Sequence, residues 1–506
     1  MELKVFKDTL TAAGSLCDAS AELPVETEIL IPDYLPQVFK IVKCFIHLVN
    51  LQKQVTGSRL VLDGYLRCVV FYQAEGNQSL CQTEQKLPFT KTVDLPAGEH
   101  QACHIHVTGD VEYLNCRAVN QRRVEVRGAY GITVSVKEQL EQEVVTALAG
   151  SGAEQKTNLL QGVRMVADVD KLMTAEEEAT FPQQPAAVLD IHGVGTVSEI
   201  KMISGKAVVK GQIEAQVLYR VDQGYQTELL KKMIPFNQIV DLADVAEDCI
   251  CYAGVEPVGC TMMASGGPEP GTMISVTALL HLRAYRPMEC CAVCDAFSTQ
   301  YEADVSYKPV LVEQLADELD EEVESRVGGM LPDENAEIIQ CFASAAPVEL
   351  AVDEDGHLML RGRATAHVFC MNSLGEIECY DKTFEYQLPG RYDGSPEDYQ
   401  LECWATATKA EGQKNGAELS ASVTIHVTGI LMQRHRETVV ESIQCHDTLE
   451  AADPAVALRI YYATAGENLF DIAKSYHVSP KTMLECNHME QLQLEEDVRL
   501  LVPMTV

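Results

Sequence analysis

The chain has 506 residues, of which 46% are hydrophobic and 23% are charged, so most of it is expected to fold. A single hydrophobic core stops growing near roughly 250 to 300 residues, which predicts three or four domains. The 75 acidic and 39 basic residues give a net charge of −36, which disfavours binding to nucleic acid or to anionic lipid. A partner would therefore present basic or apolar surface, unless the acidity only keeps the protein soluble.

The N-terminal residues, Met1 to Leu10, lack the basic start and apolar run of a secretory signal. Nor does the sequence contain the run of about 18 apolar residues that would predict a transmembrane helix. The 18 cysteines are therefore expected to be reduced and mostly buried. We expect a cytoplasmic protein with no transmembrane segment.

A pattern with a period of about 150 residues occurs three times. Residues 61–72, 208–219 and 359–370 are similar extended runs, each with a glycine at the fourth position: Gly64, Gly211 and Gly362. A second glycine follows in each copy, between two extended runs, where a hairpin turn needs a residue that tolerates positive φ. These second glycines are Gly76, Gly224 and Gly375.

The copies are also similar beyond these glycines. Copies one and two continue with Pro88-Phe89 and Pro235-Phe236, whereas the corresponding residues of copy three, 383–388, are only weakly similar. Each copy closes with alternating polar and β-branched residues, at 123–136, 273–282 and 419–427. This alternation is typical of half-buried strands, so each copy is expected to be a twisted antiparallel β unit, either a sandwich or an open barrel.

The recurrence predicts three tandem β domains, at residues 1–145, 146–312 and 313–450, of which the third is divergent. A small fourth domain is expected at residues 458–506. The acidic run 313–324 stands at the start of the third unit, and we interpret it as a solvated helix or a docking face, with the solvated face favoured.

Two groups of potential metal ligands occur in these units. His104 and His106 alternate along one strand, with His100 nearby, but no cysteine or carboxylate cluster completes the set. A Cys-x-x-Cys pair, Cys291 and Cys294, has no second pair with the spacing of a structural zinc site. We therefore expect no metal and no cofactor, and interpret these residues as structural.

The period changes after residue 458. A short strand at 460–463 is followed by Leu469, Ile472, Ala473 and Tyr476 at the spacing of one helix face. Ser479-Pro480 predicts the start of a second helix, and residues 498–503 are expected to form a closing strand. The sequence thus predicts a small α+β domain in the order strand, helix, helix, strand.

This order and its motif residues resemble a LysM domain. In that family, a groove that binds N-acetylglucosamine chains lies between the loop that opens the first helix and the loop after the second. The resemblance implies that the partner-binding or glycan-binding residues are Gly466, Glu467, Asn468, Leu469, Asn487, His488, Met489 and Leu492. The acidic triplet 495–497 replaces the usual Pro-Gly before the last strand, and carboxylates there suit a basic protein partner better than a neutral sugar.

The three β units, with their glycine strand, Pro-Phe and Val-Asp-Leu motifs, resemble the SPOCS domain of spore-forming bacteria, which is joined there to a terminal LysM. The whole arrangement is similar to clostridial spore coat morphogenesis proteins that interact with stage IV sporulation protein A, the ATP-hydrolysing base-layer protein of the coat. The resemblance implies a scaffold on the mother-cell side of the forming spore, with the LysM-like end as its dock.

No nucleotide-binding, hydrolase or metalloprotease motif is recognisable, so we expect a protein that is not an enzyme. The favoured function is a scaffold or adaptor in spore coat assembly. The alternative is a protein of the cell or spore envelope that binds peptidoglycan or N-acetylglucosamine chains. A third hypothesis is a glycan hydrolase whose carboxylate pair is assembled only in the folded chain.

Overall fold

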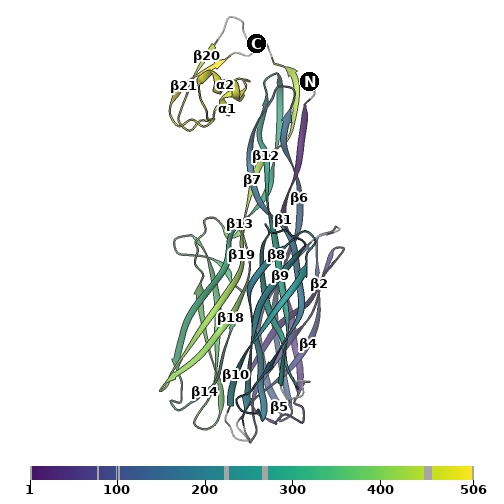
Figure 1. Cartoon of the computed structure of the whole chain (residues 1–506), viewed down its shortest axis with the longest axis vertical. Helices are drawn as coiled ribbons and strands as arrows, with labels where there is room; N and C mark the ends of the chain where they lie inside the picture. The colour runs from purple at the N-terminus through teal and green to yellow at the C-terminus, as the bar shows by residue number, and fades with distance from the viewer. Residues whose placement is uncertain are drawn as a thin grey trace.

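The computed structural model describes residues 3–76, 79–98, 100, 103–221, 227–264, 272–449 and 458–503. As expected, the fold is mainly β. Its described elements form three successive β repeats and one small C-terminal module (Figure 1). Two α-helices occur among them, both in the module, together with a short 3-10 turn, η1 (Pro396–Asp398). None of the described helices has the length and hydropathy needed to cross a membrane.

Each repeat is built from two antiparallel sheets that face each other. In the first repeat these are β1-β6-β5 and β2-β3-β4, and in the second β7-β12-β11 and β8-β9-β10. In the third repeat, the first sheet is β13-β19-β18. The second sheet has β16 at its centre. β14 and β15 take the place of the single strand β2 or β8 and pair with one edge of β16, and β17 pairs with the other edge.

The strands of the first repeat are β1 (Lys4–Leu30), β2 (Val38–Thr56), β3 (Arg59–Ala74), β4 (Leu80–Asp94), β5 (Cys103–Asn120) and β6 (Arg123–Ala149). Those of the second are β7 (Ala153–Ala179), β8 (Ala187–Ile203), β9 (Lys206–Arg220), β10 (Thr227–Asp241), β11 (Ile250–Ala264) and β12 (Thr272–Ser298). Those of the third are β13 (Tyr301–Met330), β14 (Glu337–Ala345), β15 (Glu349–Val352), β16 (Leu358–Met371), β17 (Ile377–Gln387), β18 (Tyr399–Asn415) and β19 (Glu418–Thr448).

The repeated glycines lie in the middle strand of each of these second sheets, where a side chain would not fit. A Cβ on Gly64 would lie 2.2 Å from the backbone oxygen of Val49, and one on Gly211 would lie 2.2 Å from that of Thr196. The aromatic residue of the recurring motif is the cross-strand partner of the glycine and covers it: Phe89 on Gly64, Phe236 on Gly211 and Tyr386 on Gly362.

The register therefore shows that Tyr386 is the counterpart of the two phenylalanines in the divergent third copy. The second glycines, Gly76 and Gly375, have φ values of 80° and 75° and form the expected hairpin turns. The corresponding Gly224 lies outside the described residues.

Six strands continue beyond the paired sheets as three long two-stranded ribbons, β1–β6, β7–β12 and β13–β19, which pack together as a stalk (Figure 1). Its core contains apolar residues from all three ribbons. Examples are Leu10 and Val144 from the first, Leu160 and Ala292 from the second, and Val310 and Val439 from the third.

The strands give the repeats the limits 4–149, 153–298 and 301–448. The expected boundaries at 145/146 and 312/313 lie inside β6 and β13, because the stalk strands continue past them. The acidic run 313–324 is part of β13, so the helix hypothesis for it is wrong. Four of its carboxylates, Glu318, Asp320, Glu322 and Glu324, lie on the exposed face of the strand, whereas Glu313 is buried.

The C-terminal module follows the expected order: β20 (Leu458–Ala463), α1 (Leu469–Ser475), α2 (Pro480–Asn487) and β21 (Val498–Pro503). The side chain of Asn468 caps α1 by accepting a hydrogen bond from the backbone N–H of Phe470. Ser479 precedes Pro480 at the start of α2, but its side chain forms no capping hydrogen bond.

Candidate functional site

The module is attached to the tip of the stalk through α1. Phe297, near the end of β12, is buried within the core of the module and makes an edge-to-face contact with Phe470, with 5.4 Å between ring centroids. Polar contacts surround this ring: Lys474 lies 2.6 Å from Asp295, and the imidazole of His477 lies 3.1 Å from the backbone oxygen of Ser298. The core of the module is therefore completed by a residue of the stalk.

The two loops implied by the LysM resemblance lie side by side. The backbone N–H of Leu469 donates to the oxygen of Leu492 over 2.7 Å, and the N–H of Gly466 donates to that of Leu494 over 2.8 Å. The structure thus brings the two halves of the expected site together. Gly466 has a φ of 96°, which explains why a glycine occupies this turn.

Several of the expected site residues have internal partners. Leu469 lies in the core of the module, so its side chain is not accessible to a partner. The amide of Asn487 binds the backbone of Met483 and Leu501, and Glu467 accepts hydrogen bonds from Tyr461 and Thr464. His488 ends α2 in the left-handed conformation and is exposed, whereas Asn468, Met489 and Leu492 are half-buried.

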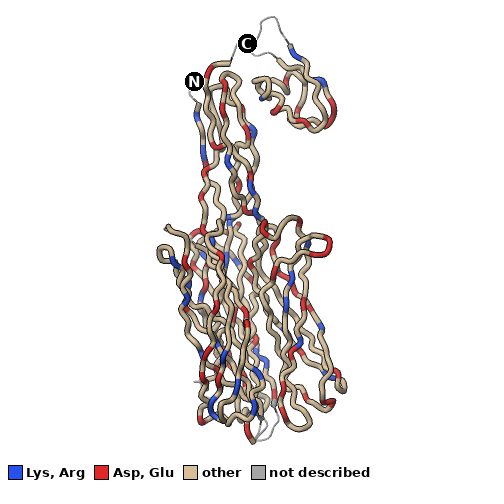
Figure 2. Tube along the Cα trace, turned by 180° about the vertical axis from the view of Figure 1, so that it is seen from behind, with Lys and Arg blue, Asp and Glu red and all other residues tan. Residues whose placement is uncertain are grey.

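An acidic and an apolar surface remain open on the module. Glu495, Glu496 and Asp497 are exposed beside the two loops, and Asp497 also accepts a hydrogen bond from the backbone N–H of Ala465. On the outer face of β20, Ile460 is 56% exposed and Tyr462 is 71% exposed. Figure 2 shows acidic positions on the module as well as along the stalk and the repeats.

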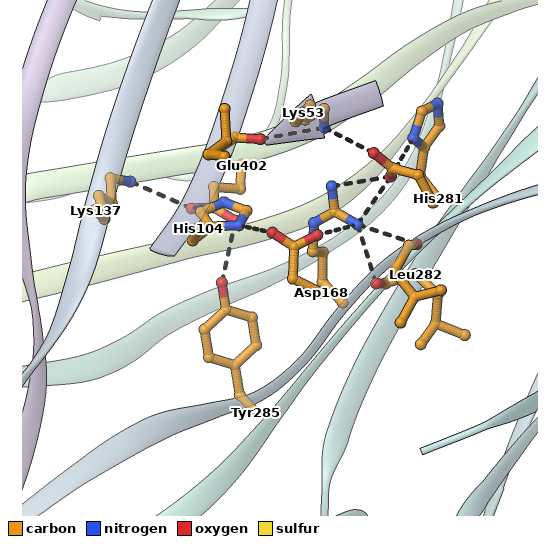
Figure 3. Close-up of polar contacts among 12 residues, drawn as sticks. Lys53, His104, Lys137, Asp168, His281, Leu282, Tyr285 and Glu402 are labelled. Atoms are coloured by element: carbon orange, nitrogen blue, oxygen red, sulfur yellow. Dashed lines mark hydrogen bonds and ion pairs between the residues drawn. The ribbon is translucent and has the colours of Figure 1, made fainter. Parts of the chain in front are cut away.

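A second candidate site, not anticipated from the sequence, joins residues of all three repeats, and Figure 3 shows its polar contacts. Its centre is Glu402 of β18, which is 2% exposed. The first repeat contributes Lys137 and His104, at 3.2 and 3.1 Å from the carboxylate. The second contributes the hydroxyl groups of Tyr252 and Tyr285, which donate over 2.7 and 3.0 Å.

A chain of ion pairs extends from this centre. His104 also contacts Asp168, and Arg283 links Asp168 to Asp170 at 2.7 and 3.1 Å. Asp170 in turn pairs with Lys53 of the first repeat at 2.7 Å. Because each link joins different strands, the network holds the three repeats together by charge as well as by apolar packing.

The environment decides the protonation states of this network. Burial alone would raise the pKa of Glu402, but His104 and Lys137 outweigh burial and hold that pKa well below its ordinary value. Burial lowers the pKa of Lys137. Burial also opposes protonation of His104, yet the carboxylates of Glu402 and Asp168 raise its pKa. The centre therefore holds a charged carboxylate among cations.

The pKa of His106, which lies two residues beyond His104 on the same strand, is shifted in the opposite direction. Burial, reinforced by His104 and Lys137, lowers its pKa to about 4, so it is neutral at pH 7. Below pH 6.5 the unfolded chain takes up a proton at this position, whereas the folded chain does so only near pH 4. His106 therefore lowers the stability of the fold as the pH falls from 6.5 to 4.

We expect His106→Gln to reduce the loss of stability between pH 7 and pH 4.5 by up to about 3 kcal/mol, since one pKa unit corresponds to about 1.4 kcal/mol. Urea unfolding at the two pH values measures this difference. His446→Gln, at an exposed position of β19, is the control and should leave it unchanged. If the pH dependence of stability were unaltered in His106→Gln, the lowered pKa of His106 would be wrong.

Two of the candidate metal residues have other partners. His104 is engaged by two carboxylates, and Cys294 lies 3.4 Å from the backbone oxygen of Lys156, whereas Cys291 is exposed. All 18 cysteines lie within the described residues, and none forms a disulfide. Across the described chain, one group of three potential ligand residues converges, His367, Cys379 and Asp381.

This group bridges the first and third repeats. The imidazole of His367 lies 2.8 Å from Asp381 through Nδ1 and 3.0 Å from the hydroxyl of Ser344 through Nε2. Lys43 of β2 forms an ion pair with the same Asp381. Lys43 supplies a positive charge beside the carboxylate of Asp381. We therefore interpret this group as part of an ion-paired contact between the first and third repeats.

Comparison with known proteins agrees with the repeat pattern. Residues 37–119 and 186–263 match the family model described as SipL, SPOCS domain. The first segment spans β2 to β5 and the second spans β8 to β11, which are equivalent strands of repeats one and two. No curated protein and no solved structure matches the chain. Two segments of the chain are thus similar to the SPOCS domain, a family that suggests a role related to sporulation.

Proposed function

We propose that the protein is a non-enzymatic scaffold in spore coat assembly, which docks the ATP-hydrolysing base-layer protein of the coat through its C-terminal, LysM-like module. The placement of this module carries the proposal. It is packed on the tip of the stalk through α1 and Phe297, while Glu495 and Glu496 beside its loops remain exposed. The three joined repeats would serve as a rigid base that presents this end.

The chemistry of the exposed loops favours a protein partner over a glycan. Three carboxylates stand beside the loops, and burying them against a neutral sugar would remove their hydration without offering a counter-charge. A basic surface would instead pair with them and would gain association rate from their field. The exposed Ile460 and Tyr462 add apolar area that such an interface can cover.

The test uses the full-length chain, because Phe297 of the stalk completes the core of the module. Immobilised wild-type chain should retain the purified base-layer protein. Reversing two charges with Glu495→Lys and Glu496→Lys should weaken this binding by about tenfold or more, since both side chains are exposed and the fold does not depend on them.

A matched pair of reversals, Glu354→Lys and Asp355→Lys, lies in the exposed turn between β15 and β16 and should leave binding unchanged. Sedimentation with purified peptidoglycan gives the competing outcome. Strong sedimentation of the wild-type chain with the wall, with no retention of the base-layer protein, would overturn the scaffold in favour of the glycan-binding alternative. Binding that survives the loop reversals would place the dock elsewhere on the chain.

A further inference from the structure

A cavity of about 490 Å³ lies among the three repeats. All three contribute to its wall, including Phe45 and His47 of the first, Gln216 and Leu279 of the second, and Phe342 and Trp404 of the third. The cavity is separate from the C-terminal module, and its size is that of a small-molecule site.

His47 lines this cavity. Its side chain has open surface, yet burial lowers its pKa to about 4. His106, whose pKa burial also lowers to about 4, lines the same cavity. Both imidazoles are therefore neutral at pH 7.

The charged groups of the wall already have partners. Lys53 pairs with Asp170 at 2.7 Å, and Arg67 pairs with Glu84 at 2.8 Å. Asp190, which is 3% exposed, accepts hydrogen bonds from His192 over 2.8 Å and from Gln340 over 3.0 Å. A charged ligand would thus find no free counter-ion among these groups, so the wall favours an uncharged one.

Two polar atoms of the wall have no partner. Gln216 is 5% exposed, and its Oε1 forms no hydrogen bond, although its amide nitrogen donates to Glu214. The Nε2 of His192 is likewise buried and unpaired. Oε1 of Gln216 is therefore a buried acceptor without a donor, and unpaired buried acceptors are unfavourable.

The rest of the wall is apolar and aromatic, with Phe45, Val69, Phe71, Leu279 and Phe342 among its residues. Water alone is poorly held against such side chains, because it needs several polar partners.

The cavity also has an entrance. A groove between the first and third repeats shares His106, Thr108, Gly109, Ala346 and Pro347 with the cavity.

We propose that the central cavity binds a small, uncharged, largely aromatic molecule that carries a hydrogen-bond donor. The aromatic part would lie against the phenylalanines, and the donor would bind the unpaired acceptor of Gln216. This binding is independent of the dock on the C-terminal module, so either proposal can fail without the other.

The test uses two dyes with the same aromatic frame. N-phenyl-1-naphthylamine is uncharged and has one N–H donor, and 8-anilinonaphthalene-1-sulfonate adds a sulfonate. Trp404, the only tryptophan of the chain, lines the cavity and can transfer excitation energy to a dye bound there. We expect the full-length chain to bind the uncharged dye with energy transfer from Trp404, and to bind the sulfonate at least about tenfold more weakly.

Thr406→Phe places a larger side chain in the cavity and should weaken binding of the uncharged dye by about tenfold, whereas Thr92→Phe on the exposed face of β4 should not. Gln216→Leu removes an unpaired acceptor and should also weaken binding, and it provides a second variant if Thr406→Phe does not fold. Absent energy transfer, equal affinity for the two dyes, or unchanged affinity in both cavity variants would each overturn the proposal.

Discussion

Replacing Glu402 with glutamine should lower the free energy of unfolding by about 3 to 5 kcal/mol. The carboxylate is buried at the junction of the three repeats and faces Lys137 and His104, which come from the first repeat. Glutamine has nearly the same shape but no charge. The substitution therefore leaves a buried ammonium group, Lys137, without its counter-ion, and the exposed fraction of that side chain is only 9%.

Urea unfolding of the full-length chain measures this effect, and two further variants identify its cause. Glu418→Gln, at an exposed position of β19, should change stability by no more than about 0.5 kcal/mol. Adding Lys137→Met to Glu402→Gln should restore part of the lost stability, because replacing both members of a buried ion pair is far less harmful than removing one. A loss below about 1 kcal/mol in Glu402→Gln would show that the network does not hold the repeats together.

The sequence predicted the features that depend on neighbouring strands. Gly64 and Gly211 recur with Phe89 and Phe236 because each aromatic ring covers its glycine on the adjacent strand. Such pairs are close in the chain, so their spacing is preserved from copy to copy.

The junction of the repeats could not be predicted in this way. Glu402 lies in a strand whose local sequence carries no motif, and its partners Lys137, Tyr252 and Tyr285 come from other repeats. Only the packing of three domains brings them together. The acidic run was ambiguous for another reason, because Leu319 and Val323 are four residues apart, a spacing that fits one face of a strand and also one face of a helix.

Phe297→Ala should destabilise the attachment of the C-terminal module by about 3 to 5 kcal/mol, the usual effect of removing a buried phenylalanine. The ring is 3% exposed and belongs to the stalk, yet it lies in the same core as Leu469, Phe470 and Ile472 of the module. Its loss would leave a cavity between two parts of the chain that are otherwise joined by surface contacts, such as that of Lys474 with Asp295. The two side chains of that pair are 36% and 20% exposed, and ion pairs near the surface contribute only about 0 to 1 kcal/mol.

Hydrogen exchange in the full-length chain can separate the module from the repeats. In Phe297→Ala, the amides of α1 should exchange much faster, while those of β3 and β9, deep in the repeats, should keep their protection. Phe39→Ala, at a position of β2 that is 58% exposed, should change neither region. If α1 kept its protection in Phe297→Ala, the module would be stable without the stalk. The module would then be joined to the repeats only by the connecting chain, and the proposal that the repeats hold it in a fixed position would be wrong.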